Sequence, residues 1–264
     1  MNFVTKNFRY VTKSFGDFVE ELSKGSKQYL RSLAASKPTE TPASISVDFP
    51  ELSPDFCLPP QLEQVAQKAH SSPLRISGPV TMWLHYDVSH HRQPKCSVGR
   101  IDVLFKVMAN VLCQIRGAKR LILYPPRDVK YLGFPAGSSS SSTNVFSVDN
   151  DTPSFLAHTH PQVARLEAGD VLFVPPLWLH SAAPQEEVSI AVNVFFRSLE
   201  SGYAAGRDVY GNRDLQAYEK GRKEVERMAK AFEGLPADVG GFYLDRLAEE
   251  LRTKARAFDR SDSQ

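Results

Sequence analysis

Two histidines and one aspartate in this chain have the types and the spacing of a metal site. His85 and Asp87 are separated by one residue, and His180 lies far downstream. Residues 80–84, which lead into His85, have the pattern of a β-strand, and residues i and i+2 of a strand face the same side. Two histidines and one carboxylate can hold Fe(II) on one face and leave the opposite face open. The alternative is that both histidines are core residues satisfied by hydrogen bonds.

The segment before His180 favours the metal site. Gly169 and Asp170 predict a turn, residues 171–174 predict a strand, and a Pro-Pro pair follows before His180. A second histidine pair, His158 and His160, has no third ligand near it in the sequence. We therefore expect this second pair to be exposed in a loop.

The residues around Lys119 predict that this lysine begins a buried strand. It follows Gly117, which predicts a turn between strands, and it precedes the apolar run of residues 121–123. A buried lysine is costly unless an anion pairs with it, and Arg120 would then face the other side of the strand. Taken alone, Lys119 would be better explained as an exposed turn lysine.

Four stretches of the sequence carry a family resemblance. They are His85-Tyr86-Asp87, residues 110–126 (NVLCQIRGAKRLILYPP), residues 167–175 (EAGDVLFVP) and residues 191–195 (AVNVF). On these stretches the chain resembles the JmjC family of Fe(II)- and 2-oxoglutarate-dependent oxygenases. Within that family it is most similar to the tRNA hydroxylases of wybutosine biosynthesis, a likeness that rests on residues 6–10, 29–33, 166–173 and 210–214. The resemblance implies a mainly β fold, the double-stranded β-helix of JmjC and cupin-like jelly rolls. It also implies Fe(II) bound by the three residues above, with no catalytic side chain beyond these ligands.

The resemblance assigns the cosubstrate, 2-oxoglutarate, to a pocket beside the metal. Its C5 carboxylate would be bound by Lys119 and by the hydroxyl of Tyr29. Asn110 and Asn193 match two asparagines that line this pocket in related hydroxylases, and structural hydrogen bonding is the alternative for both. Many relatives have a threonine where this chain has Met82. Lys119 and Tyr29 would then carry more of the recognition.

Composition limits the class of protein. With 264 residues, 42% of them hydrophobic and 23% charged, the chain is typical of a globular protein with a sizeable core. The net charge of +2 is too small to indicate a polyanionic partner by itself. The three cysteines have no paired spacing, which favours a reducing compartment, the cytoplasm or the nucleus. No apolar run approaches the roughly 18 residues of a membrane helix, so we expect no membrane partner.

The pattern of elements predicts where the β domain lies. Residues 3–11 read as a strand and residues 15–33 as a helix leading into a strand. Residues 75–197 show short strands separated by turns, interrupted by a flexible serine-rich loop at residues 137–143.

We therefore assign residues 1–200 to a JmjC-type domain with a short N-terminal part. Residues 89–107 look like an insertion, because removing them restores the family spacing between Asp87 and Asn110. This segment is either an unspliced intron or a lid at the site, and loop length alone excludes neither.

The remaining residues, 201–264, predict a helical appendage. Apolar stripes at helical spacing indicate helices over residues 217–232 and 244–258. These stripes pack either on the β domain or on a second copy of the chain, and we expect a homodimer. The first helix also carries candidate contacts to RNA phosphates, with a solvated helix face as the alternative: Arg222, Lys223, Arg227 and Lys230.

The function expected from the resemblance is hydroxylation of a tRNA nucleoside. The target would be the side chain of a wybutosine-type guanosine in the anticodon loop of tRNA-Phe, with tRNA and not DNA as the partner. One alternative is a JmjC protein hydroxylase or demethylase that acts on a peptide side chain. Another is a non-enzymatic cupin-like binding protein, which the intact triad and Lys119 disfavour.

Overall fold

The chain divides into two compact units, residues 1–215 and residues 216–264. The computed structural model describes residues 7–36, 41–62, 69–87, 109–135, 138–147, 154–196 and 213–261. The predicted domain boundary at residue 200 and the insertion at residues 89–107 lie outside these residues. No helix within the described ranges is long and apolar enough to cross a membrane.

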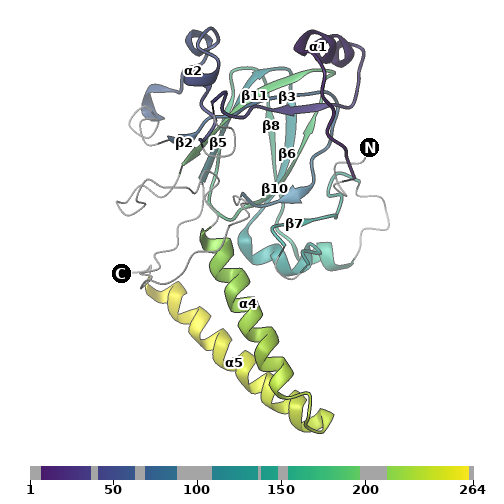
Figure 1. Ribbon diagram of the computed structural model, residues 1–264, viewed down its shortest axis with the longest axis vertical. Coiled ribbons are helices and arrows are strands. Elements are labelled where there is room, and N and C mark those ends of the chain that lie inside the picture. The colour runs from purple at the N-terminus through teal and green to yellow at the C-terminus, as the bar shows by residue number, and fades with distance from the viewer. Residues whose placement is uncertain are drawn as a thin grey trace. The chain divides into compact units, whose positions relative to one another are not determined.

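The described strands of the first unit form two antiparallel sheets (Figure 1). The larger sheet has the order β1-β3-β11-β5-β9, with β2 paired to β11. Its strands are β1 (Tyr29–Arg31), β2 (Ala69–Ser71), β3 (Leu74–Ser77), β5 (Ala109–Arg116), β9 (Val171–Val174) and β11 (Ser189–Phe196). The smaller sheet has the order β7-β4-β10-β6-β8. Its strands are β4 (Leu84–His85), β6 (Lys119–Tyr124), β7 (Ser140–Ser141), β8 (Gln162–Leu166) and β10 (Leu179–Pro184).

Helices cover the outer face of the larger sheet. Figure 1 shows α1 (Phe15–Ser23) and α2 (Ile45–Asp48) beside this sheet. Phe18, Leu22 and Ile45 of these helices pack with the strand residues Leu74 and Ile76 in one core cluster. The oxygen of Ser14 caps α1 by accepting a hydrogen bond from the backbone N–H of Asp17. Short 3-10 helices fill the remaining connections: η1 (Ser53–Asp55), η2 (Pro60–Leu62), η3 (Pro126–Tyr131) and η4 (Ser154–His158).

A second core cluster lies between the two sheets. Leu112 and Ala191 of the larger sheet pack there with Leu121 and Leu123 of the smaller sheet. Side chains alternate between the two faces of a strand. In β3 and β11, one row of side chains therefore lies under the helices and the other faces the space between the two sheets, the interior of the barrel. Both rows of these two strands are buried or half-buried, whereas Val171 and Phe173 on the outer face of β9 are exposed.

Two predicted elements are wrong. Residues 80–83 do not form a strand before His85, because the N–H of Val80 turns back to the carbonyl of Gly78. In the described part of the predicted strand over residues 3–11 there is no strand either: Asn7 forms an isolated bridge and residues 8–14 have no regular structure, while residues 3–6 lie outside the described residues. Tyr10 there is 94% exposed, so its apolar ring finds no core to bury it.

The serine-rich segment was also predicted wrongly, as a flexible loop. Ser140 and Ser141 form β7, which pairs with β4 at the edge of the smaller sheet. Ser139, Ser140 and Ser141 are all buried. Hydroxyl groups make this possible, since Ser138 donates to the carbonyl of Ser140 and so satisfies a buried acceptor locally.

The second unit is a pair of helices, as predicted. Its helices are α4 (Arg213–Ala231) and α5 (Ala237–Ser261), which run antiparallel in Figure 1. The rings of Phe232 and Tyr243 stack at the turn, with centroids 6.0 Å apart. Leu244 and Leu247 are half-buried, whereas Val225 and Leu251 are exposed. The homodimer stays a prediction.

Candidate metal centre

Cross-strand pairing brings the two predicted histidines together. His85 on β4 and His180 on β10 are direct partners in the antiparallel ladder, and their ring centroids are 4.4 Å apart. Asp87 follows just beyond the end of β4. Its Oδ1 lies 3.8 Å from Nε2 of His85 and its Oδ2 lies 3.6 Å from Nε2 of His180. One ligand atom from each residue lies within 4.8 Å of the other two, and within the described ranges this is the cluster of three that could hold a metal ion.

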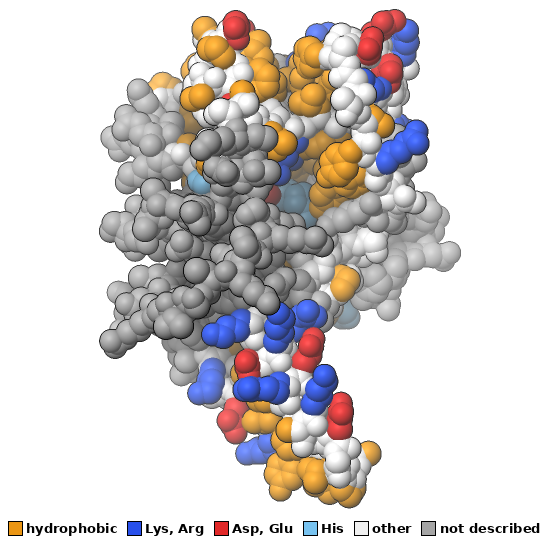
Figure 2. Space-filling model, viewed as in Figure 1, with side chains coloured by type: hydrophobic (Ala, Val, Ile, Leu, Met, Phe, Trp, Pro, Cys, Tyr) orange, Lys and Arg blue, Asp and Glu red, His pale blue; other side chains and the backbone are white. Residues whose placement is uncertain are grey.

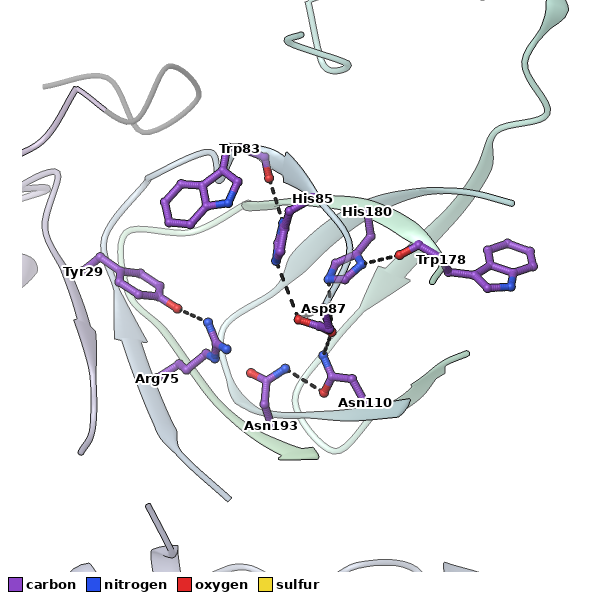
Figure 3. A network of polar contacts seen from close by, with 9 residues as sticks. All are labelled: Tyr29, Arg75, Trp83, His85, Asp87, Asn110, Trp178, His180 and Asn193. Atoms are coloured by element: carbon purple, nitrogen blue, oxygen red, sulfur yellow. Dashed lines mark hydrogen bonds and ion pairs between the residues drawn. The ribbon is translucent and has the colours of Figure 1, made fainter. Parts of the chain in front are cut away.

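Backbone carbonyl groups orient both imidazole rings (Figure 3). Nδ1 of His85 lies 3.0 Å from the carbonyl oxygen of Trp83, and Nδ1 of His180 lies 3.0 Å from that of Trp178. A carbonyl oxygen only accepts hydrogen bonds, so Nδ1 carries the proton in each ring. The lone pair of each Nε2 therefore faces Asp87. This is the orientation that metal-binding histidines need.

The electrostatics favour the metal-binding forms of His85 and Asp87 at neutral pH. Burial, together with the charge of His180, lowers the pKa of His85 to about 3, so this ring is neutral. Burial alone would raise the pKa of Asp87, but the histidines, Arg75 and a hydrogen bond from Asn110 outweigh it and lower the pKa. A neutral imidazole and an ionised carboxylate are the forms that bind metal.

The two predicted asparagines form a chain behind Asp87. Nδ2 of Asn110 donates to Oδ2 of Asp87 at 2.9 Å, and Nδ2 of Asn193 donates to Oδ1 of Asn110 at 2.9 Å. Both amides are buried. Oδ1 of Asn193 is also buried and has no hydrogen-bond partner among the described residues. These two hydrogen bonds fix the orientation of the Asp87 carboxylate. The unpaired oxygen of Asn193 faces the same interior.

Lys119 is a buried lysine, as predicted, and it begins β6. It is 8% exposed, and burial together with the charge of Arg75 lowers its pKa to about 8. No described residue forms a hydrogen bond or an ion pair with its ammonium group. The hydroxyl of Tyr29 on β1 accepts a hydrogen bond from Nη1 of Arg75.

Arg75 is a residue of the site that the sequence pattern did not predict. It lies on β3 between two buried apolar residues, Leu74 and Ile76, where a charged side chain reads as the outward face of a strand. Because both faces of the sheet are covered at β3, that face is the barrel interior. The signal that could have indicated a buried Arg75 was a charged residue inside a short strand, with an apolar residue directly on each side of it.

The remaining candidates lie elsewhere. The four basic residues predicted to bind RNA are exposed on α4, in the second unit, and two of them pair with glutamates: Arg222 with Glu226 and Arg227 with Glu224. Figure 2 shows basic and acidic side chains interleaved along this unit. His158 is exposed, as expected. His160 is exposed too, but its backbone N–H and Nδ1 both contact the carboxylate of Asp128, which is fully buried.

The sequence of residues 1–202 matches the family described as "Cupin-like domain". The chain belongs to the cupin-like domain family. Among curated relatives, this cupin-like chain is 33% identical to tRNA wybutosine-synthesizing protein 5 of Mus musculus, over 97% of this chain and 77% of that protein. The protein of the same name from Homo sapiens is 32% identical over the same shares. These matches confirm the predicted resemblance and the mainly β, cupin-like fold.

A higher identity is found with part of a longer protein. tRNA wybutosine-synthesizing protein 4 of Aspergillus fumigatus is 57% identical over 257 residues, which cover 97% of this chain and 24% of that protein. The chain therefore spans about a quarter of the length of this relative.

Proposed function

We propose that this chain is an Fe(II)- and 2-oxoglutarate-dependent hydroxylase. Its substrate would be the side chain of a wybutosine-type guanosine in tRNA-Phe. The observation that carries the proposal is the arrangement of His85, Asp87 and His180, whose donor atoms converge inside a barrel that also contains the buried ammonium group of Lys119. The names of the relatives, all tRNA wybutosine-synthesizing proteins, support the substrate.

The donor set fits Fe(II). Two neutral imidazole nitrogens and one carboxylate on one side of an ion form the facial triad of non-haem iron oxygenases. The carbonyls of Trp83 and Trp178 hold the imidazole rings, and Asn110 holds the carboxylate. When iron and 2-oxoglutarate are bound, such a site couples oxidative decarboxylation of the cosubstrate to hydroxylation of a C–H bond. The protein supplies the ligands, their orientation and an enclosed pocket.

Lys119 fits the cosubstrate. A lysine that is 8% exposed and has no acidic partner in the described part of the chain needs an anion to offset the cost of burial. The distal carboxylate of 2-oxoglutarate would supply that anion. A target base would reach a metal centre between the two sheets only when it is unstacked, as in a single-stranded loop.

The test is a reaction with tRNA-Phe that carries the unhydroxylated nucleoside. With Fe(II) and 2-oxoglutarate, we expect the nucleoside to gain one oxygen atom by mass spectrometry, with one succinate released per oxygen added. His85→Ala, Asp87→Ala and His180→Ala should each abolish both products. His158→Ala is the matched control, because this exposed histidine lies outside the triad, and it should leave turnover unchanged.

Two results would overturn the proposal. Full turnover in any one of the three triad variants would exclude the substituted residue as an iron ligand, and with it the proposed triad. Succinate release that responds to a peptide and not to tRNA would move the assignment to the protein-hydroxylase alternative.

A further inference from the structure

Arg75 brings a second cation into the barrel. It pairs with Ala191 in the register of β3 and β11, and directly opposed residues of an antiparallel pair face the same side. Ala191 is fully buried in the cluster between the two sheets, so Arg75 points into the same space. Figure 3 shows its guanidinium group between Tyr29 and Asn193, on the side of the barrel that contains Asp87.

The guanidinium group of Arg75 is only partly satisfied. Nη1 donates to the hydroxyl of Tyr29, and the group lies over the ring of Phe195 with its carbon 5.8 Å from the ring centroid. Nε is buried and has no hydrogen-bond partner among the described residues. A buried N–H without an acceptor costs free energy, so Nε of Arg75 is available to an acceptor from outside the chain. What sets Arg75 apart is its position inside the barrel, on the side of Asp87 and Lys119. Nε and Nη2 form the edge of a guanidinium that binds a carboxylate through two parallel hydrogen bonds.

The positive charges of Arg75 and Lys119 inside the barrel would be stabilised by an anion. The charge of Arg75 contributes to the lowered pKa of Lys119, so the two cations are within electrostatic reach of each other. Asp87 is the acid in this cluster, and the metal ion would use it. Two cations that repel each other in a buried space remain there at low cost only when an anion sits between them.

We propose that Arg75 is a cosubstrate-binding residue that holds the distal carboxylate of 2-oxoglutarate through Nε and Nη2, together with Lys119. This inference rests on the proposed function. In it, Tyr29 acts as a positioning residue, because its hydroxyl holds Nη1 and so turns the open edge of Arg75 toward the ligand.

The experiment compares two ligands that differ only at the distal end. 2-Oxoglutarate and pyruvate share the 2-oxo acid that binds the metal, but pyruvate lacks the distal carboxylate. Binding of each is measured by calorimetry on the Mn(II)-loaded protein without tRNA. We expect Arg75→Met to weaken 2-oxoglutarate by about ten- to a hundred-fold and to leave pyruvate unchanged. Arg75→Lys should recover only part of the loss, because an ammonium group cannot form the two-bond edge.

Arg120→Met is the matched control. Arg120 lies on β6, has a buried Nε without a partner and lies over the ring of Phe146, as Arg75 lies over Phe195. It is adjacent to Lys119 and therefore faces the other side of its strand. This variant should leave the affinity for both ligands unchanged.

The possible results separate the inference from the proposed function. An equal loss for 2-oxoglutarate and pyruvate in Arg75→Met, or no loss for either, would overturn the role of Arg75. Wild-type protein that binds Mn(II) but not 2-oxoglutarate would overturn the inference and the proposed function together. If the ligand selectivity is as expected but tRNA is not hydroxylated, the role of Arg75 stands and the proposed substrate falls.

Discussion

The buried charge of Lys119 should lower the free energy of unfolding of the ligand-free protein, and the same charge should strengthen binding of the cosubstrate. Both effects can be measured in the variant Lys119→Met. Burial lowers its pKa from 10.5 to about 8. Each unit of pKa corresponds to about 1.4 kcal/mol. The charged lysine therefore costs the folded, ligand-free protein about 3 kcal/mol at pH 7.

Lys119→Met removes the charge and keeps an unbranched side chain of similar length. We expect the free energy of unfolding of the ligand-free protein to rise by about 2–3 kcal/mol at pH 7. The sign follows from the protons bound. The folded-state pKa lies below that of the unfolded chain, so the unfolded chain binds more protons between about pH 8 and pH 10.5, and wild-type stability rises with pH there. The advantage of the variant should therefore be full below pH 8 and disappear as the pH approaches 10.5.

Urea unfolding at pH 7 and at pH 10, with the metal-loaded affinity for 2-oxoglutarate measured in parallel, checks both effects. The affinity should fall about ten- to a hundred-fold while the stability rises. Lys130→Met is the control, since Lys130 is exposed and its ammonium group lies 4.7 Å from the centroid of the Tyr131 ring. A variant at Lys119 that is less stable than wild type at pH 7, or one whose gain is equal at both pH values, would refute the reasoning.

Three further outcomes are expected. Gly117→Ala should destabilise the protein by about 2 kcal/mol or more in urea unfolding, because Gly117 has a φ of +71° and a Cβ there would collide with the carbonyl oxygen of Val188; Gly169→Ala, with open space around it, should cost only about 1 kcal/mol. Burial raises the pKa of the Cys113 thiol to about 11, so an alkylating agent at pH 8 should label the exposed Cys57 and leave Cys113 unlabelled until unfolding, as read by peptide mass spectrometry. Charge reversal on α4 should weaken tRNA binding and flatten its salt dependence in filter-binding assays, without changing the affinity for 2-oxoglutarate, and unaltered binding would exclude phosphate contacts by these residues: Arg222, Lys223, Arg227 and Lys230.

The proximity of the triad could be predicted although one step of the reasoning was wrong. The residues before His85 predict one strand that carries both His85 and Asp87, whereas β4 ends at His85 and Asp87 lies beyond it. The two still converge because one intervening residue limits how far they can separate. The distant partner, His180, was predictable from the turn and the strand that precede it, and its pairing with His85 needs the whole sheet order.

Arg75 could not be found by alternation, and the reason is physical. Alternation of apolar and polar residues locates the core only when one face of a sheet meets water. Here Leu74 and Ile76 are buried under the helices, and Arg75 lies on the opposite face, which is covered by the second sheet. The same effect conceals Asn110 and Asn193, which the family resemblance supplied and which the polar character of their positions alone would have placed outside.

The sequence of β7, beside the metal centre, affects which insertions and deletions the site can tolerate. Ser140 pairs with His85 and Ser141 pairs with Leu84, in the middle of a run of five serines. In an ordinary strand, gain or loss of one residue shifts the register and puts a different side chain opposite every partner. Within this run the next residue in line is again serine, so β4 would keep an identical neighbour after either event. Insertion or deletion of one serine in this run should therefore leave the same type of residue paired with His85 and Leu84.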